Sequence, residues 1–155
     1  MKKNLLLLFI CLSASTLYCQ KSFWGKVIGI KDGDTVVVID SLNVQTTLRL
    51  AEVDCPEKSQ AFGMKAKQFT SDEIYLKQIK YIVTDIDRYG RSIAKIYYDN
   101  NKYLSEEIIR NGFGWQYKKY STSKLLAKLE EEARKNKRGL WIDPNPIYPP
   151  DFRRK

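Results

Sequence analysis

The chain has 155 residues, a length that suits one compact domain and leaves little for a second. Its hydrophobic fraction of 43% excludes a wholly disordered protein. With 27 Lys and Arg against 18 Asp and Glu, the net charge is +9, which favours polyanionic partners such as nucleic acid, anionic lipid or acidic polysaccharide. Charge alone is equally compatible with a basic protein that binds nothing acidic.

Residues 1–19 have the pattern of an export signal. Two lysines precede an apolar run at residues 5–12, which is too short to span a bilayer as a mature helix. Cleavage is expected after Ser15 or after Cys19, so we predict a secreted or periplasmic protein. A lipid anchor on Cys19 is the alternative, although the large residues before it suit lipoprotein cleavage poorly.

After this segment the sequence predicts three strands in succession, over residues 23–30, 35–40 and 44–53. Asp32-Gly33-Asp34 is typical of a tight turn between the first two strands. In the third strand, alternation puts Leu48 and Leu50 on one face and Arg49 on the other. Pro56 cannot donate to a strand ladder, so it ends this region.

The rest of the chain is predicted to contain three helices and two strands. Phe62, Ala66 and Phe69 recur at helical spacing, which predicts a helix over residues 61–76. Further elements follow: strands at 79–86 and 92–98, a short helix from Leu104 that ends near Asn111, and a helix at 123–137. Residues 143–155 contain four prolines and are expected to form an extended wrap.

This order of elements is the OB-fold pattern. We predict an α+β domain over residues 20–142: a five-stranded OB-fold β-barrel with a helix between strands 3 and 4 and two C-terminal helices. Residues 143–155 form its proline-rich tail. We expect a monomer without a membrane span. The OB-fold often binds oligonucleotides, but a fold does not by itself define a function.

Three segments carry side chains suited to phosphodiester chemistry: DGDT at 32–35, RLAEVDCPE at 49–57 and DRYGR at 87–91. Taken singly, each suits an ordinary turn, strand exit or hairpin. Together, Asp34 and Asp54 offer hard oxygen ligands for calcium. Arg49 and Arg91 offer guanidinium groups to a phosphate, and Glu57 offers a base for water. The chain has no histidine, which excludes a catalytic His.

In this order and spacing, the three segments resemble the motifs of the staphylococcal nuclease family. The later segments GFGWQY at 112–117, LEEEAR at 129–134 and GLW at 139–141 resemble it too. The resemblance runs from about Lys26 to the end of the chain. It implies a calcium-dependent nuclease that cuts DNA and RNA and leaves 3′-phosphate ends.

The resemblance also implies roles for individual residues. The calcium ligands would be Asp34, Asp54 and the backbone carbonyl of Cys55. The catalytic residues would be Arg49, Glu57 and Arg91. The nucleotide contacts would come from Arg88, Tyr89, Trp115 and Tyr117. The chain departs from the family at Cys55, where Thr is frequent, and at Glu52, where Gly or an aliphatic residue is usual.

Two other functions compete with a secreted nuclease. The same fold with a defective site would be a nucleic-acid-binding module, and a basic surface protein could bind polyanions without specificity. Glu57 and both arginines are present, which favours the enzyme.

Overall fold

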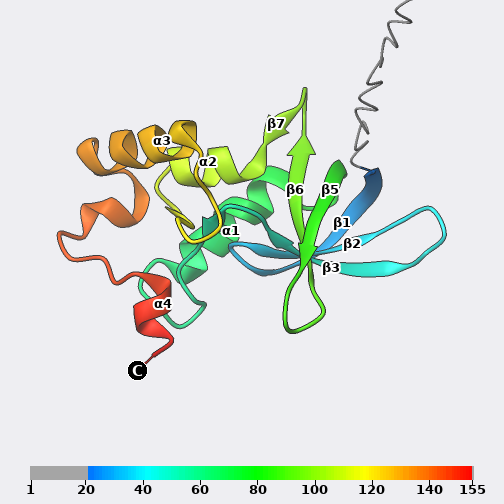
Figure 1. Ribbon diagram of the computed structural model, residues 1–155, viewed down its shortest axis with the longest axis horizontal. Helices are drawn as coiled ribbons and strands as arrows, with labels where there is room; N and C mark the ends of the chain where they lie inside the picture. The colour runs from blue at the N-terminus through cyan, green and yellow to red at the C-terminus, as the bar shows by residue number, and fades with distance from the viewer. Residues whose placement is uncertain (1–20, 155) are drawn as a thin grey trace, which may run out of the picture.

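A computed structural model describes residues 21–154, so the predicted export signal lies outside the described part of the chain. The main sheet consists of β1 (Ser22–Asp32), β2 (Thr35–Ile39), β3 (Gln45–Leu50), β5 (Gln78–Ile86), β6 (Ser92–Tyr98) and β7 (Lys102–Tyr103). Its strand order is β3-β2-β1-β5-β6-β7, and an additional pairing of β3 with β6 closes five of the strands into a barrel. The predicted α+β barrel fold is therefore confirmed (Figure 1).

The closing pair is parallel, whereas the other strand pairs of the main sheet are antiparallel. In this pair Leu48 lies opposite Ser92 and Arg49 lies opposite Ile93. Because β6 begins at Ser92, the hairpin between β5 and β6 ends directly beside β3. The closure thus brings two motifs that are far apart in the sequence to the same part of the barrel.

Helices α1 (Gly63–Ile74) and α2 (Leu104–Arg110) pack on the barrel, and α3 (Lys124–Lys135) packs on α2. Leu48 and Leu50 are buried in the core, as the alternation predicted. Figure 1 shows α2 and α3 together on one side of the barrel. Within residues 21–154, no helix is both long and apolar enough to cross a membrane.

The third strand is shorter than predicted, because it breaks after Leu50. Glu52 adopts a left-handed backbone conformation with φ 67°. The chain resumes as β4 (Val53–Asp54), which pairs with β8 (Trp115–Gln116) in a second small sheet. The break is stabilised by tertiary hydrogen bonds to Ala51, whose carbonyl oxygen accepts a 2.8 Å bond from the Ser105 hydroxyl.

Helix α1 is also shorter than the predicted 61–76. Phe62 has φ 65°, so the helix begins at Gly63, and it ends at Ile74 because Tyr75 is extended. Gly63 packs directly on the loop that carries Glu57. A Cβ at this position would lie 1.8 Å from the Glu57 carbonyl oxygen, so only glycine fits.

The proline-rich tail is not the extended wrap that we predicted. It follows a 3₁₀ helix at Gly139–Ile142 and ends in the helical turn α4 (Pro149–Phe152). Proline suits the first turn of a helix because its fixed φ is already helical and its missing N–H would have no partner there. The Tyr148 ring packs against Trp115 at 5.8 Å between centroids, which anchors the turn to the domain.

Candidate active site

The turn between β1 and β2 presents Asp34 to the interior of the site. The Thr70 hydroxyl of α1 donates to the Gly33 carbonyl at 2.6 Å, and Leu50 N donates to the Asp34 carbonyl at 2.8 Å. The Asp34 carboxylate accepts bonds from Thr35 Oγ1 at 3.1 Å and from Cys55 N at 2.9 Å. These bonds hold the first motif against the second.

Arg49 joins the two predicted carboxylate ligands. Its Nη2 lies 2.8 Å from Asp54 Oδ1 and 3.2 Å from Asp34 Oδ2. Its Nη1 donates to the carbonyls of Leu50 and Val53 at 2.8 and 2.9 Å, so the strand break wraps around the guanidinium. The structure therefore brings together three residues that the sequence predicted for one site.

Burial and the neighbouring charges have opposite effects on the pKa values of Asp54 and Arg49. Asp54 has no exposed side-chain surface, and burial raises the pKa of its carboxyl group against the opposing effect of Arg49. Burial works against the charged form of Arg49 as well, but Asp34 and Asp54 outweigh it and raise the Arg49 pKa. Arg49 therefore remains a cation, which the two acids require. Burial also raises the pKa of the Cys55 thiol, so the thiol stays protonated.

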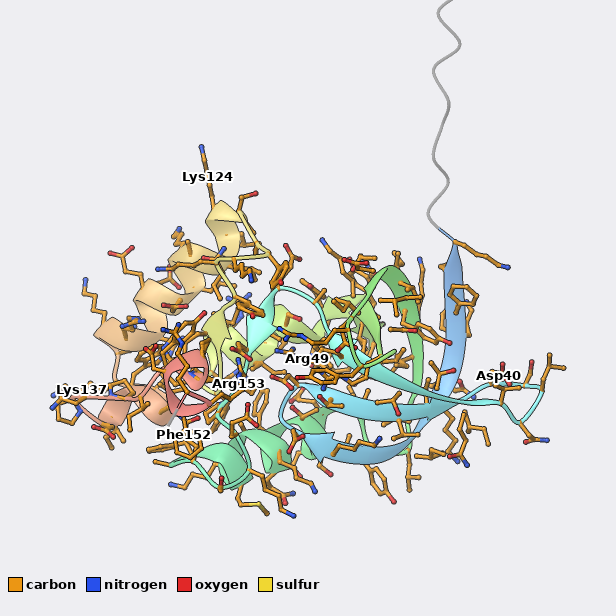
Figure 2. All side chains as sticks on the ribbon, turned by 60° about the horizontal axis from the view of Figure 1, so that its bottom comes forward. Asp40, Arg49, Lys124, Lys137, Phe152 and Arg153 are labelled. Carbon is orange, nitrogen blue, oxygen red and sulfur yellow. The ribbon has the colours of Figure 1, made fainter. Side chains whose placement is uncertain are left out.

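Glu57 lies next to this cluster, and a residue that the sequence analysis missed connects the two. Arg153, directly after α4, contacts Asp54 Oδ2 with its Nη2 at 2.8 Å. Its Nη1 forms an ion pair with Glu57 Oε1. Figure 2 shows Arg153 and Arg49 near each other in the centre of the molecule. The sequence indicates a basic chain end, but contains no indication of the contact.

Asp32 is a second residue that the sequence analysis left out of the site. Burial raises the pKa of its carboxyl group, and the negative charges of Asp34 and Glu57 raise it further. Asp32 therefore lies within electrostatic range of both acids. The sequence feature that could have identified Asp32 as a site residue is its position in the same turn as Asp34.

The DRYGR segment forms the hairpin beside β3. The Asp87 carboxylate accepts bonds from the backbone N–H groups of Tyr89 and Arg91, and Arg91 Nε contacts it at 2.7 Å. Burial opposes ionisation of the Asp87 carboxyl group, but these bonds together outweigh it and lower the pKa of Asp87. In the residues that the structure describes, Arg91 makes no ion pair with Asp34, Asp54 or Glu57.

The hairpin that carries Arg91 nevertheless meets the barrel beside β3, because Arg91 directly precedes β6. Arg49 lies opposite Ile93, and Arg91 precedes Ile93 by two residues. Beside it, the Tyr89 ring is 74% exposed, with Arg88 and Arg91 at 5.7 and 5.5 Å from its centroid. A hairpin tip with arginines and an exposed aromatic ring is suited to bind a nucleotide, because the arginines can contact phosphate and the ring can stack on a base.

The structure separates the two remaining predicted nucleotide contacts. Trp115 is only 5% exposed and packs against Trp141 and Tyr148, with centroid distances of 5.3 and 5.8 Å. Its ring therefore has little free surface for stacking on a base, and it serves the small core instead. Tyr117 is half-buried and packs edge-on against the exposed Tyr120 at 4.9 Å, so this pair remains accessible.

Glu52 faces away from the Arg49 cluster. Its carboxylate pairs with Lys95 at 3.0 Å and accepts bonds from the hydroxyls of Tyr103 and Ser121 at 2.9 and 3.1 Å. Burial opposes ionisation of this acid, but these partners outweigh it and lower the Glu52 pKa. Its role is to hold the bent chain between β3 and β4.

The donor set fits a hard cation. Asp34 and Asp54 are carboxylates, the ligand type that calcium prefers, and both contact one cationic nitrogen of Arg49. Between Lys21 and Arg154, no three His, Cys, Asp or Glu side chains are grouped to hold a metal. A set of two carboxylates and the Cys55 carbonyl is consistent with that finding, because it needs only two such side chains.

Comparison with known proteins agrees with this geometry. Residues 47–143 match the family described as "Staphylococcal nuclease homologue". An uncharacterized endonuclease of Haemophilus influenzae is 39% identical over 152 residues, covering 98% of this chain and 83% of the relative. A micrococcal nuclease of Shigella flexneri is 35% identical over 143 residues, covering 85% of this chain and 81% of the relative.

A probable staphylococcal-like nuclease of Oryza sativa subsp. japonica is also similar, with 36% identity over 107 residues. That stretch covers 69% of this chain but 29% of the plant protein, so only one part of the larger protein corresponds to this domain. The family match and the coverage of the bacterial relatives lead to one conclusion: this chain belongs to the staphylococcal nuclease homologue family and is a nuclease.

Proposed function

We propose that the protein is an exported, calcium-dependent nuclease that hydrolyses phosphodiester bonds in DNA and RNA. The observation that carries this proposal is the position of Arg49 between Asp34 and Asp54, with Glu57 linked to Asp54 through Arg153. A buried guanidinium, two carboxylates and a partly exposed acid are the groups that phosphodiester hydrolysis requires.

Each group has a task in the proposed reaction. Glu57 accepts a proton from the attacking water, which forms a bond to phosphorus as the bond to the leaving oxygen breaks. Arg49 and Arg91 donate hydrogen bonds to the phosphoryl oxygens, whose negative charge rises in the transition state. Tyr89 and the Tyr117–Tyr120 pair supply exposed aromatic surface for the neighbouring nucleotides.

Calcium, held by Asp34, Asp54 and the Cys55 carbonyl, would supply positive charge to the phosphate and orient it. In the described structure Arg49 Nη2 is engaged by both carboxylates. A cation that neutralises these carboxylates would leave Arg49 available to donate to phosphate. Binding of the metal and binding of the phosphate are thus coupled, because both change the contacts of the Arg49 guanidinium.

We expect that removal of divalent metal abolishes cleavage. An all-oxygen donor set prefers calcium over magnesium, because magnesium is smaller and requires near-ideal octahedral geometry. Cleavage of a fluorescent oligonucleotide, measured with calcium, with magnesium and with EDTA, tests this requirement. Equal rates in calcium and EDTA would contradict it.

The competing function is a nuclease-like module that binds nucleic acid without cutting it. Both functions predict binding of single-stranded oligonucleotides, so binding does not separate them. Product analysis does, because only the enzyme releases shorter fragments when calcium is added. Detection of tight binding with no fragments under these conditions would favour the module.

Export rests on the first 19 residues alone. We expect a mature chain that begins near Gln20, directly before β1, and is not attached to lipid. Intact-mass analysis of protein from the native host measures this terminus. A chain that begins at an acylated Cys19 would replace the soluble form by a membrane-anchored one, and an uncleaved chain would contradict export.

A further inference from the structure

We propose that Arg153 is an internal latch: its guanidinium occupies Asp54 and Glu57, and calcium has to displace it before the site can work. This inference rests on the calcium-dependent function proposed above. It concerns the regulation of that site by the last turn of the chain.

The contact is a charge-assisted bridge between the chain end and the site. Arg153 Nη2 lies 2.8 Å from Asp54 Oδ2, and its Nη1 lies 3.5 Å from Asp54 Oδ1 and pairs with Glu57 Oε1. A guanidinium is planar and can engage two acceptors at once. In this arrangement it contacts both a proposed metal ligand and the proposed base.

Burial shows that the site is covered. The Asp54 side chain is 0% exposed, so an ion from solvent reaches its carboxylate only after another group moves. Arg49 is held more firmly than Arg153, because the bonds of its Nη1 to two backbone carbonyls remain even when its Nη2 releases the two carboxylates. Arg153 is 43% exposed and follows a helix of only four residues. Arg153 is therefore the movable cover.

Arg153 and calcium compete for the same charge. A cation bound to Asp54 would neutralise the carboxylate that holds Arg153, and two positive groups on one carboxylate repel each other. Glu57 is subject to the same constraint, because Arg153 Nη1 occupies its Oε1, and that oxygen cannot accept a hydrogen bond from water while the pair is in place. The bridge to Arg153 thus opposes both metal binding and catalysis.

The latch can open without unfolding the tail. Gln60 donates to the Ile147 carbonyl, Tyr148 packs on Trp115, and Pro149 is buried. These contacts anchor the tail before Arg153. The Arg153 side chain is 43% exposed, so it can rotate away from Asp54 and Glu57 while these contacts stay in place.

Calorimetric titration with calcium, in the absence of nucleic acid, tests the latch directly. We expect Arg153→Gln to bind calcium about tenfold more tightly than the wild type, because the variant has no charge-assisted bridge to break. Arg154→Gln is the matched control: Arg154 is the adjacent residue, 78% exposed, and pairs only with Asp151 in the described structure. It should leave the calcium affinity unchanged.

Thermal denaturation supplies a second readout that does not depend on activity. Arg153→Gln should lower the Tm in EDTA, and the deficit should shrink with calcium, because the ligand and the latch are linked through the same carboxylate. If Arg153→Gln binds calcium tenfold more tightly, saturating calcium should restore about 1.4 kcal/mol of its lost stability relative to the wild type.

The outcomes separate the latch from the function on which it rests. If every variant binds calcium with the wild-type affinity, or Arg153→Gln binds it more weakly, the latch is wrong and the nuclease mechanism stands. If neither the wild type nor Arg153→Gln binds calcium, the proposed calcium dependence is wrong, and the latch fails with it.

Discussion

Glu57→Gln is expected to lower kcat by about a hundredfold or more, because the variant cannot accept a proton from water. The substitution keeps the size and shape of the side chain. Its environment is tolerant, since the Glu57 side chain is 34% exposed. The fold should therefore remain intact, and oligonucleotide cleavage at saturating calcium measures the effect.

Glu52→Gln is the matched control for this experiment. Glu52 lies in the same motif, but its carboxylate faces Lys95, Tyr103 and Ser121. We expect this variant to lose some stability and to keep most of its kcat below its melting temperature. Near-wild-type cleavage by Glu57→Gln would remove Glu57 from the mechanism, and an equal loss in both variants would point to a general electrostatic effect.

Arg49→Met should cost about 3–5 kcal/mol of unfolding free energy without calcium, because it leaves Asp34 and Asp54 without their shared cation. Arg49 is 11% exposed and its partners are 10% and 0% exposed, so water compensates little for the loss. Methionine retains much of the apolar stem. Urea denaturation measures the change. Arg154→Met, which removes a pair between side chains that are 78% and 59% exposed, should change stability by less than about 1 kcal/mol.

The loss of stability in Arg49→Met is expected to increase as the pH rises. Without Arg49, the folded-state pKa of Asp54 lies further above its unfolded value, so the folded variant holds a proton that the unfolded chain releases. Stability that depends on this proton is present at low pH and is lost as the pH rises through the folded pKa. The deficit relative to wild type should therefore be larger at neutral than at acidic pH. A deficit that is constant with pH would show that Asp54 is not the destabilised group.

Local patterns in the sequence were sufficient for the barrel. Strands β1 and β2 and the turn between them follow from β-branched residues around Asp32-Gly33-Asp34, because turn type and alternation are short-range properties. The burial of Leu48 and Leu50 was predicted for the same reason. The three motifs also sufficed to select the family, which the comparison with known proteins confirmed.

Other features required the tertiary structure, because their causes lie far away in the chain. The third strand was predicted through Val53, but hydrogen bonds of Ala51 and Glu52 with Ser105, Ala94 and Tyr117 stabilise a bend there. Trp115 was predicted to contact nucleotides, yet Trp141 and Tyr148 bury its ring. Each case depends on a partner that no local pattern reveals.

The sequence by itself predicted the type of fold, because strand alternation and turn signals are local, and its three motifs predicted the family and one shared site for Asp34, Arg49 and Asp54. Only the tertiary structure decided what faces these residues. It turned Glu52 away from the site and brought Arg153 onto Asp54 across 99 positions of sequence. The physical reason is that a buried carboxylate requires a cation, and which cation reaches it depends on how the whole chain packs.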